Sequence, residues 1–215
     1  MTFVKKTDDI INIDVDDIPT VSIIKAQSDT MFNVILLSAN NNGAGKTTHA
    51  KNLEKFIREL LPCTYVYRMP LANFAKTQYK NTNDYNNNFG SLDIFGDTFK
   101  NRTCLGKSGR EYLKDFAEQK CSEDPLVWCK EWYAAFMGFK HKNLNDLNYL
   151  RTIIIVEDIR KVYELAFFRR AFSDYKITHK HFISEYGQYD ADFPDTKIGG
   201  ILEKLADKVE YIKKE

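Results

Sequence analysis

The chain has few of the features that secreted, zinc-binding or membrane-spanning proteins need. Its cysteines, Cys63, Cys104, Cys121 and Cys129, form no C-x-x-C pair and have no histidine at the spacing of a zinc site. No run of 18 apolar residues exists, and the first residues contain no apolar segment of the kind that a secretory signal requires. We therefore expect buried thiols in a reducing, cytoplasmic compartment and no membrane-spanning segment.

Net charge is also nearly absent, because 31 lysines and arginines stand against 30 acidic residues and leave a net charge of +1. This balance gives no general attraction to nucleic acid or to an anionic membrane, so any anion binding must come from cations placed locally. Stable nucleic-acid binding is therefore not expected. A small charged substrate agrees better with this composition.

What the chain does contain is a strand, a loop and a helix in immediate succession. The short branched apolar run over 32–37 predicts a buried parallel strand. From Ala50 to Leu61, apolar residues recur at intervals of three and four, which predicts a helix that Pro62 ends. Between strand and helix, residues 40–47 follow the spacing G-x-x-x-x-G-K-[ST] of a phosphate-binding loop.

Each residue type in this loop has a physical role. Backbone N–H groups of the loop and of the helix N-terminus would surround phosphate oxygens, Lys46 would meet the terminal phosphates, and the Thr47 hydroxyl would ligate Mg²⁺. Asn40 replaces the first glycine, and asparagine tolerates the left-handed backbone region that glycine serves there. The alternative is a strand-to-helix turn that binds no ligand. The predicted ATP-binding residues are Asn41, Asn42, Gly43, Ala44, Gly45, Lys46, Thr47 and Thr48.

Two further strand ends are expected at the same rim. The β-branched run over 152–156 predicts a central strand that ends in the residues Glu-Asp-Ile-Arg. An acidic residue there can orient Mg²⁺ or hold a substrate hydroxyl, and Asp158 and Arg160 face one side if the extended backbone continues to residue 160. A strand over 64–69 places Arg68 on this rim, where it binds a phosphate or, alternatively, is a solvated surface residue.

The remaining segments define the fold class. Residues 1–30 are predicted as an N-terminal extension, a hairpin or edge strand that covers a sheet edge or contacts a second copy in a homodimer. The order of strands and helices over residues 31–215 predicts an α/β three-layer sandwich around a five-stranded, mainly parallel sheet. Helices are expected from Pro70, with proline at the first position, from Gly109, and from Asp124 to about Phe139.

Two interpretations stay open in the middle of the chain. The asparagine-rich segment over 81–102 predicts a long polar loop, which is either a lid over the site or an insertion without function. Trp128 lies on an aromatic helix face, which is either core or a platform for a nucleobase.

Taken together, these segments resemble the deoxynucleoside monophosphate kinases of large phages and related viruses. Four short blocks carry the resemblance: LSANNNGAGKTT at 37–48, GREYLKDFAE at 109–118, DPLVW at 124–128 and VEDIR at 156–160. HFISE at 181–185 is a weaker match. Besides Asn40, the chain departs from the family at Lys114 and at Phe116 and Ala117. These departures bear on base selectivity more than on phosphoryl transfer.

The resemblance implies a P-loop kinase domain that transfers the γ-phosphoryl group of ATP, with Mg²⁺, to a deoxynucleoside monophosphate. It implies that Arg110, Asp158 and Arg160 bind substrate and that Trp128 lies at the nucleotide. We expect Lys46, Arg110 and Arg160 to be catalytic, Thr47 and Asp158 to hold the metal, and Arg68 to assist with the acceptor. Two alternatives are a P-loop kinase for another small phosphorylated acceptor and a nucleotide-binding protein without turnover.

Overall fold

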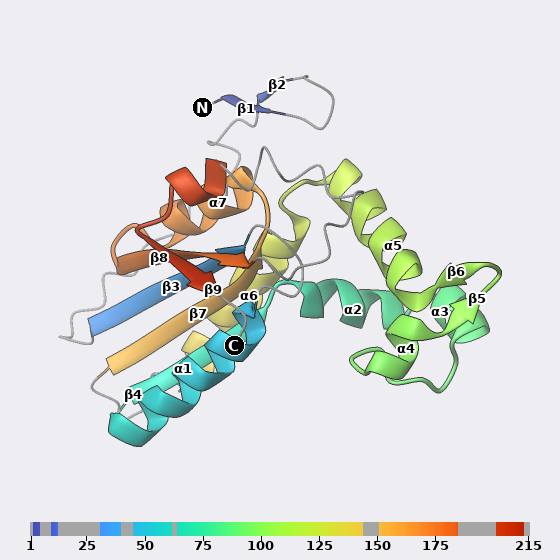
Figure 1. Ribbon diagram of the computed structural model, residues 1–215, viewed down its shortest axis with the longest axis horizontal. Coiled ribbons are helices and arrows are strands. Elements are labelled where there is room, and N and C mark those ends of the chain that lie inside the picture. Colours follow the sequence, from blue (N-terminus) through green and yellow to red (C-terminus); the bar gives the residue numbers. More distant parts are fainter. Residues whose placement is uncertain are drawn as a thin grey trace. The chain divides into compact units, whose positions relative to one another are not determined.

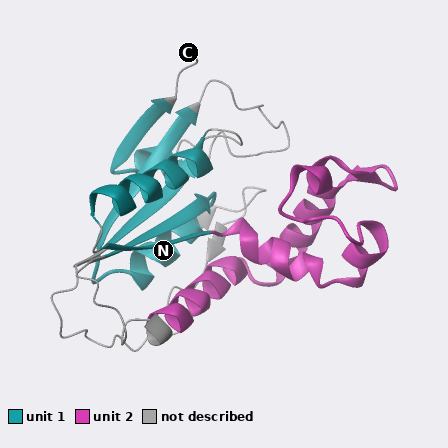
Figure 2. Cartoon of the chain, turned by 90° about the horizontal axis from the view of Figure 1, so that it is seen from below, with its two compact units in different colours: residues 1–69, 146–215 teal, residues 70–145 magenta. Residues whose placement is uncertain are grey.

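The computed structural model describes residues 2–4, 10–12, 31–39, 45–61, 64–143, 151–184 and 201–212. These residues form two compact units, one from residues 1–69 and 146–215 and the other from residues 70–145 (Figure 2). The domain boundary predicted at residue 30 stays a prediction, because residues 13–30 lie outside the described residues.

The first unit is an α/β structure built on a five-stranded, mostly parallel sheet. Its strand order is β4-β7-β3-β8-β9, and the pairings β3 with β7, β3 with β8, and β8 with β9 are parallel (Figure 1). Residues 201–204 are helical as well. The elements are β3 (Met31–Ala39), α1 (Lys46–Leu60), β4 (Thr64–Pro70), β7 (Arg151–Ile159), α7 (Val162–Ala171), β8 (Lys176–Ser184) and β9 (Lys208–Ile212).

Helices cover the sheet because the inner strands are apolar on both faces. Leu37 and Ile155 pack with Ala50 and Ile57 of α1 on one face. Leu36 and Ile154, which point to the other face, are completely buried, and α7 lies on that side (Figure 1). The predicted α/β class and the mainly parallel five-stranded sheet are therefore confirmed, and the arrangement is compatible with three α/β/α layers.

A separate two-stranded antiparallel sheet is formed by β1 (Thr2–Val4) and β2 (Ile10–Asn12). Both strands fall in the segment for which a hairpin or an edge strand is predicted. Residues 13–30 lie outside the described residues.

The second unit is mainly helical. Its elements are α2 (Ala72–Lys80), α3 (Asn83–Asn88), α4 (Asp97–Asn101), β5 (Thr103–Cys104), β6 (Lys107–Ser108), α5 (Gly109–Glu123) and α6 (Val127–Asn143). Pro70 is the last residue of β4 and α2 begins at Ala72, so the predicted proline at the first helical position is wrong. Proline has no backbone N–H group, and the last residue of a strand need not donate one to the sheet, so proline is tolerated there.

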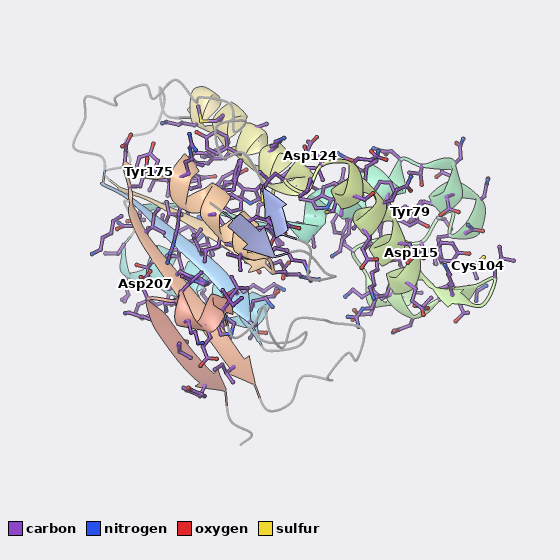
Figure 3. All side chains as sticks on the ribbon, turned by 90° about the horizontal axis from the view of Figure 1, so that it is seen from above. Tyr79, Cys104, Asp115, Asp124, Tyr175 and Asp207 are labelled. Atoms are coloured by element: carbon purple, nitrogen blue, oxygen red, sulfur yellow. The ribbon has the colours of Figure 1, made fainter. Side chains whose placement is uncertain are left out.

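The predicted long polar loop over 81–102 is also wrong, because this segment folds around aromatic side chains. Thr82 caps α3 by accepting a hydrogen bond from the backbone N–H of Tyr85, and α4 follows after a short connection. Tyr79, which Figure 3 labels, donates to the Asp84 carboxylate at 2.7 Å. The buried cluster of this unit consists of Tyr79, Tyr85, Phe89, Ile94 and Phe99.

Two composition-based expectations can be compared with the described helices and cysteines. None of the described helices is both long and apolar enough to cross a bilayer. The three described cysteines are free thiols, but only Cys129 is buried, whereas Cys104 and Cys121 are partly exposed. The expectation that the thiols are buried is thus correct for one of these three.

Candidate functional site at the N-terminus of α1

The candidate site lies between the end of the strand β3 and the start of the helix α1. Gly45 is the N-cap of α1 and has a φ of 74°, in the left-handed region where a side chain is strained. Among the described residues, no side chain caps this helix end, so none of them occupies its first N–H groups. Residues 40–44, which include the predicted Asn41, Asn42, Gly43 and Ala44, lie outside the described residues.

Lys46 is the first residue of α1 and is buried, with 9% of its surface exposed. Burial lowers the pKa of its ammonium group to about 8, and the charge of Arg160 acts in the same direction. The charges of Asp158 and Glu157 oppose this shift. The structure thus brings two predicted site residues, Asp158 and Arg160, close enough to Lys46 for their charges to act on it.

The end of β7 departs from a regular strand at the two acidic residues. Val156 pairs with Leu36 of β3, but Ile159 pairs with Ser38, so two residues of β7 lie opposite one residue of β3. Asp158 has a φ of 66°, which is uncommon for a residue with a side chain. The extended backbone therefore does not continue to residue 160. The alternation from which Asp158 and Arg160 were predicted to face one side does not hold.

Glu157 is the residue at this strand end that sequence reasoning passed over. Its side chain is fully buried, and its Oε1 atom accepts a hydrogen bond from Nη1 of Arg68 at 2.5 Å. Burial raises the pKa of this carboxyl group, whereas hydrogen bonds from Arg68 and from the Thr47 side chain lower this pKa by a smaller amount. Its other oxygen, Oε2, has no hydrogen-bond partner among the described residues.

Arg68 lies at the end of β4, as predicted, but it is engaged by carboxylates. Besides Glu157, it binds Oε2 of Glu54 through Nε at 2.6 Å. Glu54 also pairs with Arg58 on the exposed side of α1. Arg68 is therefore a structural link between α1, β4 and β7 in this structure, and its predicted contact with an acceptor phosphate stays a prediction.

A second buried polar group lies on β3 and β8. The Ser38 hydroxyl lies 2.7 Å from Nε2 of His179 and 2.8 Å from Nδ1 of His181, and all three side chains are fully buried. Asp207, labelled in Figure 3, accepts the backbone N–H of His179 at 2.7 Å. Burial lowers the pKa of each imidazole to about 4, so both are neutral at pH 7.

The direction of these hydrogen bonds follows from the partners. Nδ1 of His179 faces the carbonyl oxygen of Leu205 at 3.4 Å and therefore carries the proton, so the Ser38 hydroxyl donates to Nε2 of His179. His181 must then donate to Ser38, and its own Nε2 has no partner among the described residues. The alternating pattern His-Lys-His over 179–181 was the signal that could have revealed this pair.

The other predicted residues are exposed or belong to the second unit. Thr47 and Thr48 lie exposed in the first turn of α1. Arg110 is exposed in the first turn of α5, and the Trp128 side chain is buried, 6.3 Å from the ring of Phe116. This burial fits the core alternative for Trp128. That Arg110 and Trp128 act beside Lys46 stays a prediction.

The residue types at the site suit a polyphosphate with Mg²⁺ better than a metal held by protein alone. Among the described residues, no group of three or more His, Cys, Asp or Glu side chains is arranged to hold a metal ion. Mg²⁺ is commonly bound by one or two side-chain oxygens together with substrate phosphates and water. Thr47 and the unpartnered Oε2 of Glu157 provide oxygen atoms of this kind.

Comparison with protein-family models finds no match to this chain, and comparison with curated proteins finds no significant match either. The resemblance to viral deoxynucleoside monophosphate kinases therefore depends on the four sequence blocks, and the function must be argued from the site.

Proposed function

We infer that the protein is a P-loop kinase that transfers the γ-phosphoryl group of ATP to the 5′-phosphate of a deoxynucleoside monophosphate, giving ADP and the diphosphate. The observation that carries this proposal is the buried Lys46 ammonium, which follows a left-handed Gly45 and on which the charges of Glu157, Asp158 and Arg160 act. A buried lysine with acidic and basic neighbours suits an anion that brings its own cation.

The arrangement supports phosphoryl transfer because both reactants are anions. The main work of such a site is to hold donor and acceptor in line and to stabilise the charge that moves between them. In this proposal, Lys46 and the first N–H groups of α1 bind the donor phosphates, and Arg160 and Arg110 bind the acceptor phosphate. Mg²⁺, when bound, neutralises charge on the β- and γ-phosphates. The acceptor is already ionised, so no strong general base is needed.

The test is a coupled assay of ADP formation with each of the four common deoxynucleoside monophosphates. The wild-type protein should produce ADP only with Mg²⁺ and an acceptor. Lys46→Ala should lower the rate about a hundredfold, as expected for loss of roughly 3 kcal/mol of transition-state stabilisation. Lys51→Ala removes an exposed lysine from the same helix and should leave the rate unchanged.

Other outcomes identify the alternatives. Normal turnover by Lys46→Ala would remove this lysine from the mechanism. Transfer of labelled phosphate to a different phosphorylated acceptor would indicate a P-loop kinase of another specificity. Binding of ATP without any Mg²⁺-dependent ADP formation would indicate a nucleotide-binding protein without turnover. As a deoxynucleotide kinase, the protein would work in the cytoplasm, which is that of the host cell if the gene is viral.

A further inference from the structure

We propose that Glu157, rather than Asp158, is the carboxylate that positions the divalent cation of the bound nucleotide, by accepting hydrogen bonds from the water ligands of the cation that Thr47 binds. This proposal builds on the proposed function, because it concerns the metal of a bound nucleotide. It replaces Asp158 with its neighbour in the metal-holding role and gives Glu157 a role that sequence reasoning did not assign.

One carboxylate oxygen of Glu157 is unsatisfied among the described residues. Its Oε1 atom is bound by Arg68, but Oε2 is buried and has no hydrogen-bond partner among the described residues. A buried acceptor without a partner destabilises the fold, and the cost is larger for a charged group than for a neutral one. Such an atom is expected to receive a donor when the site is filled, and water bound to a dication is a strong donor.

Glu157 lies on the face of the sheet that α1 covers. Ile153 and Ile155 of β7 pack in the cluster that includes α1, and side chains alternate along a strand. Glu157 continues this series toward the carboxyl end of β7, where a hydrogen bond from the Thr47 side chain lowers the pKa of its carboxyl group. The threonine of the phosphate-loop motif and the buried carboxylate therefore meet on the α1 side of the sheet.

The backbone at Asp158 is irregular. The bulge at the end of β7 and the positive φ of Asp158 break the alternation by which Asp158 and Arg160 were predicted to face one side. Asp158 is only half-buried, and its negative charge still acts on both Lys46 and Glu157. Two carboxylates this close repel each other, and a divalent cation near Thr47 would relieve that repulsion.

The Glu157 carboxylate is held in place by Arg68. Arg68 binds Glu157 and Glu54 at once, so the carboxylate is fixed by residues of β4 and α1. Groups that orient metal ligands or their water through a second layer of hydrogen bonds change metal affinity by roughly 10- to 100-fold. A change of this size should be measurable without turnover.

The experiment measures Mn²⁺ affinity of the full-length protein in the presence of a saturating non-hydrolysable ATP analogue, by electron paramagnetic resonance. Binding of the same analogue with a metal chelator is measured separately by calorimetry. Glu157→Gln, which keeps the hydrogen bond to Arg68, should weaken Mn²⁺ affinity about tenfold or more. It should leave analogue binding in chelator unchanged. Asp158→Asn removes only a neighbouring charge and should weaken Mn²⁺ affinity less than Glu157→Gln does.

Glu54→Gln is the matched control, because it also removes a charged partner of Arg68 but leaves Oε2 of Glu157 intact. A loss of Mn²⁺ affinity in Glu54→Gln as large as in Glu157→Gln would reduce Glu157 to a structural role and overturn the proposal. Loss in Asp158→Asn alone would overturn it as well. Wild-type affinity in Glu157→Gln, with analogue binding intact, would refute only this inference. A wild-type protein that binds no analogue would refute the proposed function too.

Discussion

Replacing Arg68 by alanine should destabilise the protein far more than removing a surface arginine. Arg68 is the residue that pairs with the fully buried Glu157, and the side chain of Arg68 itself is only 20% exposed. Breaking a buried ion pair from one side costs about 3 to 5 kcal/mol, because the remaining charge stays buried without compensation. Since Arg68 retains some contact with water, we expect the lower end, a loss of about 3 kcal/mol.

Arg58→Ala is the matched control. Arg58 pairs with the same Glu54 carboxylate as Arg68, but its side chain is 52% exposed. An exposed pair contributes at most about 1 kcal/mol, so this variant should lose less than that. The assay is urea unfolding followed by far-ultraviolet circular dichroism, with the free energy of unfolding compared among wild type, Arg68→Ala and Arg58→Ala.

The pH dependence gives a sharper test of the same reasoning. Burial already raises the pKa of Glu157 above its ordinary value of 4.5, and loss of Arg68 removes an interaction that lowers it. For a carboxyl group whose folded pKa is raised, the folded state is favoured below the unfolded pKa, and this advantage is lost as pH rises through the folded pKa. The deficit of Arg68→Ala should therefore be largest near neutral pH and shrink toward about pH 5.

The double variant Arg68→Ala with Glu157→Gln removes the uncompensated charge and should recover part of the lost stability. The reasoning would be refuted if Arg68→Ala lost no more stability than Arg58→Ala. It would also be refuted if the deficit of Arg68→Ala were the same at both pH values.

Further predictions concern the acceptor site and the helical unit. Arg160→Ala should lower kcat/KM for the monophosphate by about a hundredfold and change KM for ATP much less, as steady-state kinetics can show; a defect confined to ATP would contradict the acceptor role. Gly109→Ala should lower Tm strongly, because a Cβ atom would clash with the carbonyl oxygen of Phe99. Gly138→Ala in α6 meets no described atom within 4 Å and should raise stability by about 0.5 to 1 kcal/mol. An equal effect of the two glycine substitutions on Tm would contradict the packing around Phe99.

Much of the first unit was readable from the sequence because its signals are local. The branched run over 32–37 and the one over 152–156 correspond to β3 and β7, and the periodic apolar residues after Lys46 correspond to α1. Strands buried on both faces leave continuous apolar runs, and a helix next to a sheet leaves a periodic stripe. These patterns do not depend on contacts between distant residues.

The prediction of a loop over 81–102 was wrong because the segment is rich in asparagine and its few aromatic residues do not stand out. Six asparagines suggest a loop, yet Tyr85, Phe89 and Phe99 supply the apolar surface around which α3 and α4 fold. The threonine three residues before Tyr85 was an available helix-start signal. Short helices of this kind are stabilised by packing more than by propensity, and packing partners are not visible in the sequence.

The site itself was predicted only in part, for a related reason. Lys46 follows from motif spacing, and Asp158 and Arg160 follow from their place at a strand end and from the family resemblance; in the structure, the charges of Asp158 and Arg160 act on Lys46. Glu157 was passed over because alternation paired Asp158 with Arg160 on one side, and a bulge with a positive φ breaks that alternation. No pattern of residue types in the sequence predicts a bulge of this kind.

The position of β3 in the middle of the sheet has a consequence for synthesis on the ribosome. Both neighbours of β3, at 151–159 and 176–184, follow the entire second unit in the chain. When β3 leaves the exit tunnel, the two strands that pair with it have therefore not yet been translated, and its apolar side chains have no strand to pack with. The helical unit, whose contacts are closer in sequence, can fold during that interval, so chaperones that shield nascent hydrophobic segments would be needed at β3 before anywhere else.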